Sequence, residues 1–136
     1  SLIAERVPDL KMLINHLTGL TITGEPADAE WSAAVKKAAT HPNVHCKVSG
    51  IFQRSGQSPA PKNLSYYAPI FKVVYDAFGE DRIIYGSNWP VTDRGGEYQE
   101  QFDVIHEFFE PMGRPVLEKL LWKNASQFYG VKLSSD

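Results

Sequence analysis

The stretch RIIYGSNWPVTD, residues 82–93, has the pattern of a buried strand that ends in a loop. Residues 83–85 are β-favouring, and Gly86 begins the break in the strand. Asn88 therefore stands where a strand passes into a loop, the place where α/β proteins commonly carry functional side chains. A carboxamide neither holds nor releases a proton at neutral pH. Asn88 is either a turn residue or a residue at a catalytic position from which the acid is missing.

Two earlier segments share this pattern of a short apolar run followed by polar residues. LKMLIN precedes His16, and NVHCKVSG spans residues 43–50. Apolar residues at helical spacing follow each strand, in the segments 28–41, 63–79, 97–113 and 114–131. This alternation predicts right-handed βαβ units and a parallel sheet. Because no glycine-rich phosphate loop follows a strand, the pattern favours a segment of a (β/α) barrel over a nucleotide-binding sheet.

The loops that follow the first two strands are long and rich in Gly, Ser, Thr and Pro. They span residues 18–30 and 51–63, whereas the connections from helix to strand near 41–42 and 79–81 are short. In barrel enzymes the long loops after the strands form the active face. The asymmetry predicts that function lies at the carboxyl ends of the strands.

Apolar and polar residues alternate along the second predicted strand. The polar set is His45, Lys47 and Ser49, and the apolar set is Val44, Cys46 and Val48. In a barrel the apolar set would pack outward against helices, with Lys47 and Ser49 inside and nearest the mouth. A buried Lys47 would need a partner, because an isolated ammonium in a dry interior is costly. The alternative is a lysine that reaches solvent from an edge strand.

Composition excludes several classes of partner. The chain has 136 residues, of which 43% are hydrophobic, with a net charge of -2 from 14 basic and 16 acidic residues. Interspersed charges predict no binding of nucleic acid or of an anionic membrane, and no apolar run is long enough to span a bilayer. A single cysteine, Cys46, favours a reducing, cytoplasmic compartment. The expected partner is a small-molecule substrate.

Three residues at the strand ends have both a functional and a structural interpretation. His16 is either a site residue or a hydrogen-bonded structural histidine. Asn88 is either a site residue or a turn residue that caps local amides. Trp89 either lines a ligand pocket or covers the rim of the barrel.

Four motifs in order resemble the carboxy-terminal part of the amidohydrolase-related (amidohydrolase 2) family of TIM-barrel hydrolases. This group includes enzymes like L-fuconolactonase and 2-pyrone-4,6-dicarboxylate lactonase. The motifs are ERVPDLKMLINHLTGL, NVHCKVSGI, DRIIYGSNWPV and WKNASQFYGV. The resemblance spans nearly the whole chain. It implies that residues 1–136 are the carboxy-terminal portion of one (β/α)8 domain, about three βα units, whose earlier strands are absent from this chain.

The resemblance also implies roles for individual residues. His16 matches a strand-end histidine that binds metal or substrate. Asn88 matches an aspartate of the last strand that ordinarily takes a proton from the attacking water, which a carboxamide cannot do. Asp93 is a nearby carboxylate on the following loop. The family's His-x-His pair is missing from these 136 residues, so we expect the chain alone to bind metal poorly and to be inactive.

Two functions follow as alternatives. The first is a hydrolase that opens a small lactone or a related ester or amide, with one divalent metal such as zinc in the complete barrel or without metal. His16 and Asn88 would be catalytic, and Lys47, Ser49 and Trp89 would bind substrate. The second is a catalytically inactive barrel that binds a small sugar-like or acidic ligand. Open barrel edges also predict self-association.

Overall fold

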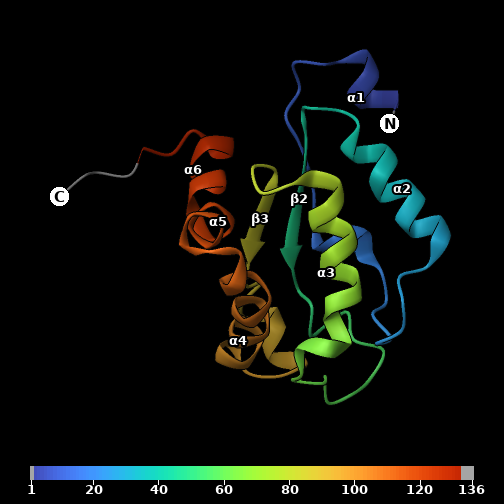
Figure 1. The fold of residues 1–136 in the computed structure, drawn as a ribbon, viewed down its shortest axis with the longest axis vertical. Coiled ribbons are helices and arrows are strands. Elements are labelled where there is room, and N and C mark those ends of the chain that lie inside the picture. Colours follow the sequence, from blue (N-terminus) through green and yellow to red (C-terminus); the bar gives the residue numbers. More distant parts are fainter. Residues whose placement is uncertain (1, 133–136) are drawn as a thin grey trace.

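The computed structural model describes residues 2–132 and contains one parallel sheet with the strand order β1-β2-β3. The strands are β1 (Met12–Ile14), β2 (Val44–Ser49) and β3 (Ile83–Gly86). In the register, Met12 pairs with Val44, and Cys46 pairs with both Ile14 and Ile83. All three carboxyl ends therefore meet at one edge of the sheet (Figure 1). The predicted parallel βα units are confirmed.

The helices fall where the apolar spacing predicts them. They are α1 (Leu2–Arg6), α2 (Ala29–Ala39), α3 (Leu64–Phe78), α4 (Tyr98–Phe109), α5 (Arg114–Glu118) and α6 (Asn124–Tyr129). A π-helical turn, Lys119–Lys123, joins α5 to α6. None of the helices among the described residues is long and apolar enough to cross a membrane.

Local capping explains where two of these helices begin and end. Asp28 Oδ1 accepts a hydrogen bond of 2.9 Å from the Trp31 amide, which satisfies a free N–H at the start of α2. Helix α3 ends at Gly79, whose φ of 67° lies in the region that glycine adopts at little cost. The Asp28 hydrogen bond and the Gly79 conformation thus place the start of α2 and the end of α3 close to the bounds of the predicted segments 28–41 and 63–79.

Helices α2 and α3 pack on one face of the sheet (Figure 1). The side chains of β2 that face them are the predicted apolar set, since Val44, Cys46 and Val48 are exposed by 3%, 1% and 0%. Phe71 of α3 is fully buried and extends the core to α4, where its ring packs against that of Phe108 at 5.3 Å between centroids. Burial of these apolar side chains is the main favourable term for the fold.

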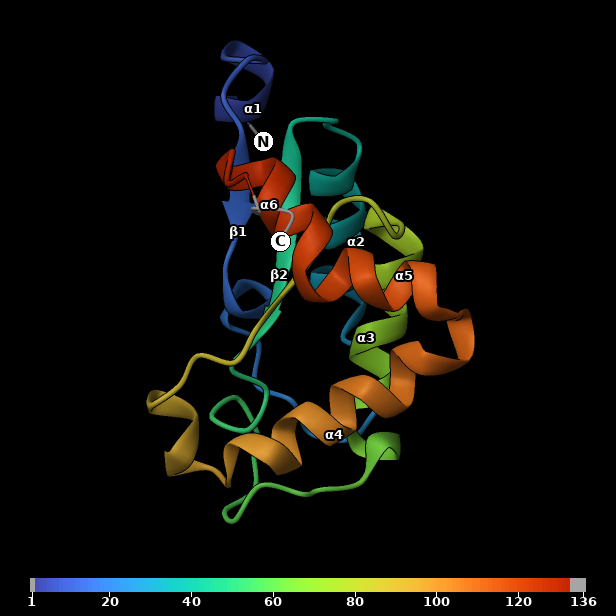
Figure 2. The same cartoon turned by 90° about the vertical axis from the view of Figure 1, so that its left-hand side faces the viewer.

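The last helix covers part of the opposite face, where α6 passes in front of β1 and β2 in Figure 2. Asn124 holds α6 in place by donating hydrogen bonds of 2.7 and 2.8 Å to the carbonyl groups of Glu80 and Ile83. The Phe128 ring then packs edge-on against His45, at 4.9 Å between centroids. Within residues 2–132, β1 and β3 each pair only with β2, and self-association through these edges stays a prediction.

Candidate functional site

The polar residues at the three strand ends lie around one hollow of about 290 Å³. Its lining consists of Asn15 and His16 after β1, Lys47 and Ser49 from β2, and Gly86 and Asn88 at the end of β3. Because neighbouring parallel strands place side chains of the same register on the same face, the predicted inward set converges here. The tertiary structure therefore brings together four of the five predicted site residues.

His16 is held by a buried serine. The Ser49 hydroxyl, on a side chain only 2% exposed, forms a hydrogen bond of 2.9 Å with His16 Nδ1. Burial lowers the pKa of His16 below its ordinary value of 6.5, and the charges of Arg54 and Lys47 lower it further. The imidazole is thus neutral at pH 7, with Nε2 as the nitrogen that has no partner within residues 2–132. It can accept a proton or bind a cation there.

Lys47 has a hydrogen-bonding partner, as its inward position on β2 requires. Its ammonium donates a hydrogen bond of 3.1 Å to the Tyr129 hydroxyl at the end of α6. Gly86 makes room for the lysine stem, because a Cβ at this position would lie 3.2 Å from Lys47 Cδ. The hollow therefore contains a positive charge that a neutral hydroxyl, and not a carboxylate, holds in place.

Asn88 combines the two interpretations that the sequence leaves open. Its φ of 57° is the left-handed conformation that asparagine adopts more readily than most residues, so it does shape the turn. Its side chain nevertheless lines the hollow and donates a hydrogen bond from Nδ2 to Gln53 Oε1. The carboxamide is therefore oriented by a partner from the loop that follows β2.

Two further residues of this loop, Gln53 and Arg54, were not predicted from the sequence. Arg54 Nη1 makes a long bond of 3.5 Å to the Gly19 carbonyl, while its buried Nε has no partner among residues 2–132. The available signal was their place just after β2 in a long loop on the predicted active face. Neither residue is part of a recognisable motif, so the signal did not single them out.

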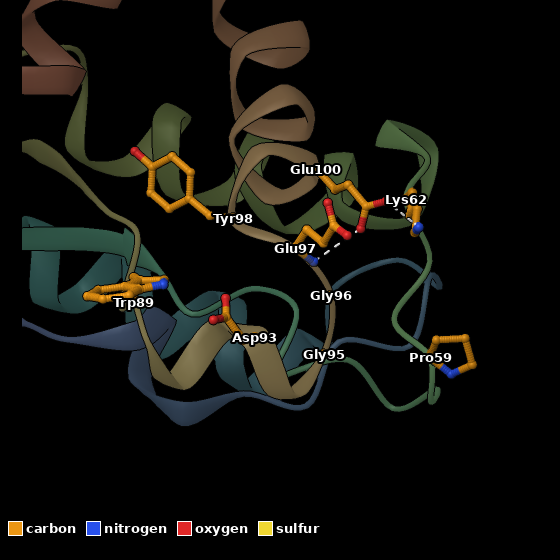
Figure 3. Close-up of a pocket in the computed structure, with 9 residues that line it drawn as sticks. All are labelled: Pro59, Lys62, Trp89, Asp93, Gly95, Gly96, Glu97, Tyr98 and Glu100. Atoms are coloured by element: carbon orange, nitrogen blue, oxygen red, sulfur yellow. Dashed lines mark hydrogen bonds and ion pairs between the residues drawn. The ribbon is translucent and has the colours of Figure 1, made fainter.

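Trp89 lies outside the hollow that contains His16. Its side chain is 63% exposed and borders a larger hollow of about 600 Å³ together with Asp93 and Tyr98 (Figure 3). An ion pair between Lys62 and Glu100 lies farther along the same wall. Asp93, the nearby carboxylate considered from the sequence, therefore belongs to the Trp89 hollow.

Comparison with known proteins agrees with the motifs quoted above. A family model described as amidohydrolase matches residues 1–131. The chain belongs to the amidohydrolase family. An L-fucono-1,5-lactonase from Burkholderia ambifaria is 38% identical over 95 residues, which are 70% of this chain and 31% of that protein. An L-rhamnono-gamma-lactonase from Scheffersomyces stipitis is 34% identical, over 93% of this chain and 43% of that protein.

Solved amidohydrolase structures have the same fold in this region. An amidohydrolase from Burkholderia multivorans with bound HEPES superposes with a TM-score of 0.85 at 22% identity, covering 96% of this chain and 48% of that chain. Another crystal form, with bound zinc, gives a TM-score of 0.79 at 21% identity and the same coverage. This amidohydrolase chain thus spans less than half the length of the relatives that it matches.

The residues of this amidohydrolase do not by themselves fit a zinc site. Within residues 2–132, no group of three or more His, Cys, Asp or Glu side chains is placed to hold a metal ion. Catalytic zinc commonly takes three protein ligands, and His16 alone among the residues that line the hollow has an ordinary zinc-binding side chain. Asn88 also turns its Nδ2 group toward Gln53. His16 could therefore supply one ligand to a metal held mainly by other groups.

We therefore expect zinc titrated into the 136-residue chain to show no one-to-one site, because one imidazole gives only weak binding. Isothermal titration calorimetry measures this directly, and His16→Asn is the matched variant that removes the one candidate ligand. Similar small heats from both proteins are the expected result. A saturable one-to-one complex that His16→Asn abolishes would contradict the prediction.

Proposed function

We propose that this chain supplies the carboxy-terminal strands of a (β/α)8 barrel that opens a small lactone, or a related ester or amide, by attack of water. The observation that carries the proposal is the His16 imidazole, held neutral by its surroundings and oriented by Ser49 at the carboxyl end of a parallel strand. Barrel enzymes bind substrates at this end of the strands. The named relatives act on sugar lactones, which supports a lactone as the substrate.

The residues of the hollow can accept the proton and stabilise the negative charge that appear during lactone hydrolysis. With its Nδ1–H donated to Ser49 Oγ, His16 accepts a proton at Nε2 from water as the water oxygen bonds to the carbonyl carbon. The carbonyl oxygen becomes an oxyanion, and the Lys47 ammonium in the same hollow stabilises it. When the ring C–O bond breaks, the imidazolium returns its proton to the leaving oxygen. Asn88 orients the water or the carbonyl group.

A specific observation favours a second function. None of the side chains that line the hollow is a carboxylate, and Asn88 stands at the position of the expected acid. The positive charges of Lys47 and Arg54 both act on His16. A catalytically inactive barrel that binds a small sugar-like or acidic ligand would also have these features.

Two substitutions of Asn88, made in the complete barrel protein to which this chain contributes, separate the functions. If the protein is a hydrolase, Asn88→Ala is expected to lower kcat for a sugar lactone by about 10²-fold, because an oriented hydrogen-bonding group is lost from the transition state. The measurement is the release of acid from a panel of lactones at constant pH. Asn63→Ala, at an exposed asparagine on the same loop face, is the control and should keep the native rate.

The second substitution, Asn88→Asp, tests the alternative that the barrel is catalytically inactive. An inactive barrel would show no native turnover, and Asn88→Asp would restore a carboxylate that can accept a proton. Activity that appears only in Asn88→Asp would therefore overturn the hydrolase proposal. Native activity that Asn88→Ala removes would overturn the binding proposal.

A further inference from the structure

Gln53 lies beside the hollow, where it is bonded to Asn88 of the lining, and an unusually close approach at Gly50 brings it next to His16. The φ of Gly50 is 62°, in the left-handed region. A Cβ on Gly50 would lie 3.2 Å from Gln53 Cδ and 3.3 Å from His16 Nδ1. The absence of a side chain therefore lets the Gln53 carboxamide and the His16 ring converge on the same point. Gln53 therefore lies directly behind Asn88 and next to His16, two residues that line the hollow, and it borders an adjoining hollow as well.

The backbone around Gln53 is firmly held. Arg54 N donates a hydrogen bond of 3.1 Å to the Gly50 carbonyl, which closes a helical turn around Gln53. The two preceding residues, Ile51 and Phe52, are 0% and 2% exposed, so they anchor the turn in the core. Phe52 is itself tightly packed, because a Cβ on Gly95 would lie only 2.8 Å from its backbone. The position of the Gln53 carboxamide is thus set by the fold and not by a mobile loop tip.

The Gln53–Asn88 pair leaves a defined set of hydrogen-bonding groups free. Asn88 uses one N–H and Gln53 uses its carbonyl oxygen in the bond between them. Asn88 Oδ1 remains as an acceptor, and Gln53 Nε2 keeps two donors. An adjacent donor and acceptor suit a hydroxyl group, which both accepts and donates. The pair carries no charge, so binding a neutral group here leaves no unpaired charge behind.

We propose that Gln53 is a specificity-determining residue that, together with Asn88, binds a hydroxyl group of a polyhydroxylated substrate. The substrate class rests on the proposed lactone hydrolysis, and the hydroxyl recognition rests on the geometry of the amide pair. Lys47, which lines the same hollow as Asn88, binds the carbonyl end of the same molecule. The amide pair then distinguishes a sugar lactone from an unsubstituted lactone of the same ring size.

Two variants of Gln53 test this assignment in the complete barrel protein. Gln53→Met keeps the length of the side chain and removes all hydrogen bonding. Gln53→Glu keeps an oxygen that accepts from Asn88 and removes both donors. The control is Gln57→Met, the same change at an exposed position of the same loop. Thermal unfolding of each variant checks that the fold is retained.

The decisive kinetic readout is the ratio of kcat/KM for L-rhamnono-1,4-lactone to that for γ-butyrolactone, which has the same ring without hydroxyl groups on it. We expect both Gln53 variants to lower this ratio by about 10-fold or more, because a site group that hydrogen-bonds the substrate hydroxyl discriminates strongly against analogues without it. Gln53→Glu, which keeps the oxygen that accepts from Asn88, should lower the rate for the sugar lactone more than the rate for γ-butyrolactone, and Gln57→Met should leave the ratio unchanged. An unchanged ratio in both Gln53 variants would overturn the inference and leave the hydrolase proposal standing.

A binding experiment tests the inference when neither lactone is turned over. L-rhamnonate, the open-chain hydroxy acid, is titrated into ¹⁵N-labelled protein while the side-chain NH₂ signals of Gln53 and Asn88 are followed. Saturable shifts of both signals, lost in Gln53→Met, would support hydroxyl recognition although the hydrolase proposal had failed. If rhamnonate binds without moving these signals, or does not bind to a protein that turns nothing over, the inference is wrong.

Discussion

Replacing His16 with asparagine is expected to lower kcat/KM of the complete barrel protein for a sugar lactone by about 10²- to 10⁴-fold, the usual contribution of a positioned acid–base group. Asparagine is the informative choice because His16 has a φ of 52°, a conformation that asparagine tolerates. Its carboxamide can also keep a hydrogen bond to Ser49. The variant should therefore keep the fold and lose the ring nitrogen that accepts the proton.

The pH profile separates a catalytic role of His16 from a structural one. Burial and the neighbouring positive charges lower the pKa of His16 below 6.5, so the neutral form predominates at pH 7. As the pH falls through this lowered pKa, the imidazole gains a proton and kcat/KM should decrease. His16→Asn should lose this acidic limb, whereas His106→Asn, on α4, should keep both the rate and the limb. A full rate in His16→Asn would exclude His16 as the base.

The largest expected effect on stability comes from Phe71→Ala in α3. The Phe71 side chain is fully buried, and its ring lies 6.1 Å from that of Tyr67 and 6.4 Å from that of Phe109, between centroids. Truncation removes apolar burial and leaves a cavity between α3 and α4, which costs about 3–5 kcal/mol of unfolding free energy. Because domains are stable by only about 5–15 kcal/mol, we expect a large fall in the urea midpoint.

Lys72→Ala is the matched control for this prediction, since Lys72 is the next residue on α3 and points into solvent. Its ion pair with Asp76, at 2.8 Å, is exposed and spans one helical turn, so its loss should cost less than about 0.5 kcal/mol. If both variants lost the same unfolding free energy, the loss would come from any substitution in α3 and not from the buried aromatic ring, and the prediction would be wrong. Circular dichroism during urea unfolding measures both.

The sequence predicts the strands, the helices and most of the residues that line the hollow, because these depend on neighbours within a few residues. Alternation along 44–49 correctly divides the outward apolar set from Lys47 and Ser49, since side chains on a strand point to opposite faces in turn. The place of His16 and Asn88 at strand ends likewise follows from the breaks in apolar runs. The parallel order of the strands then brings these ends together.

The contacts that complete the site join residues far apart in the chain, so no local pattern predicts them. Gln53 is 35 residues from Asn88, and Ser49 is 33 residues from His16. The left-handed backbone at Asn88 also turns the chain, so that Trp89 borders a different hollow from its neighbour. The sequence by itself thus determined the elements and the family, because periodicity and motifs are local. Only the tertiary structure decided which side chains meet, because packing selects partners by distance in space.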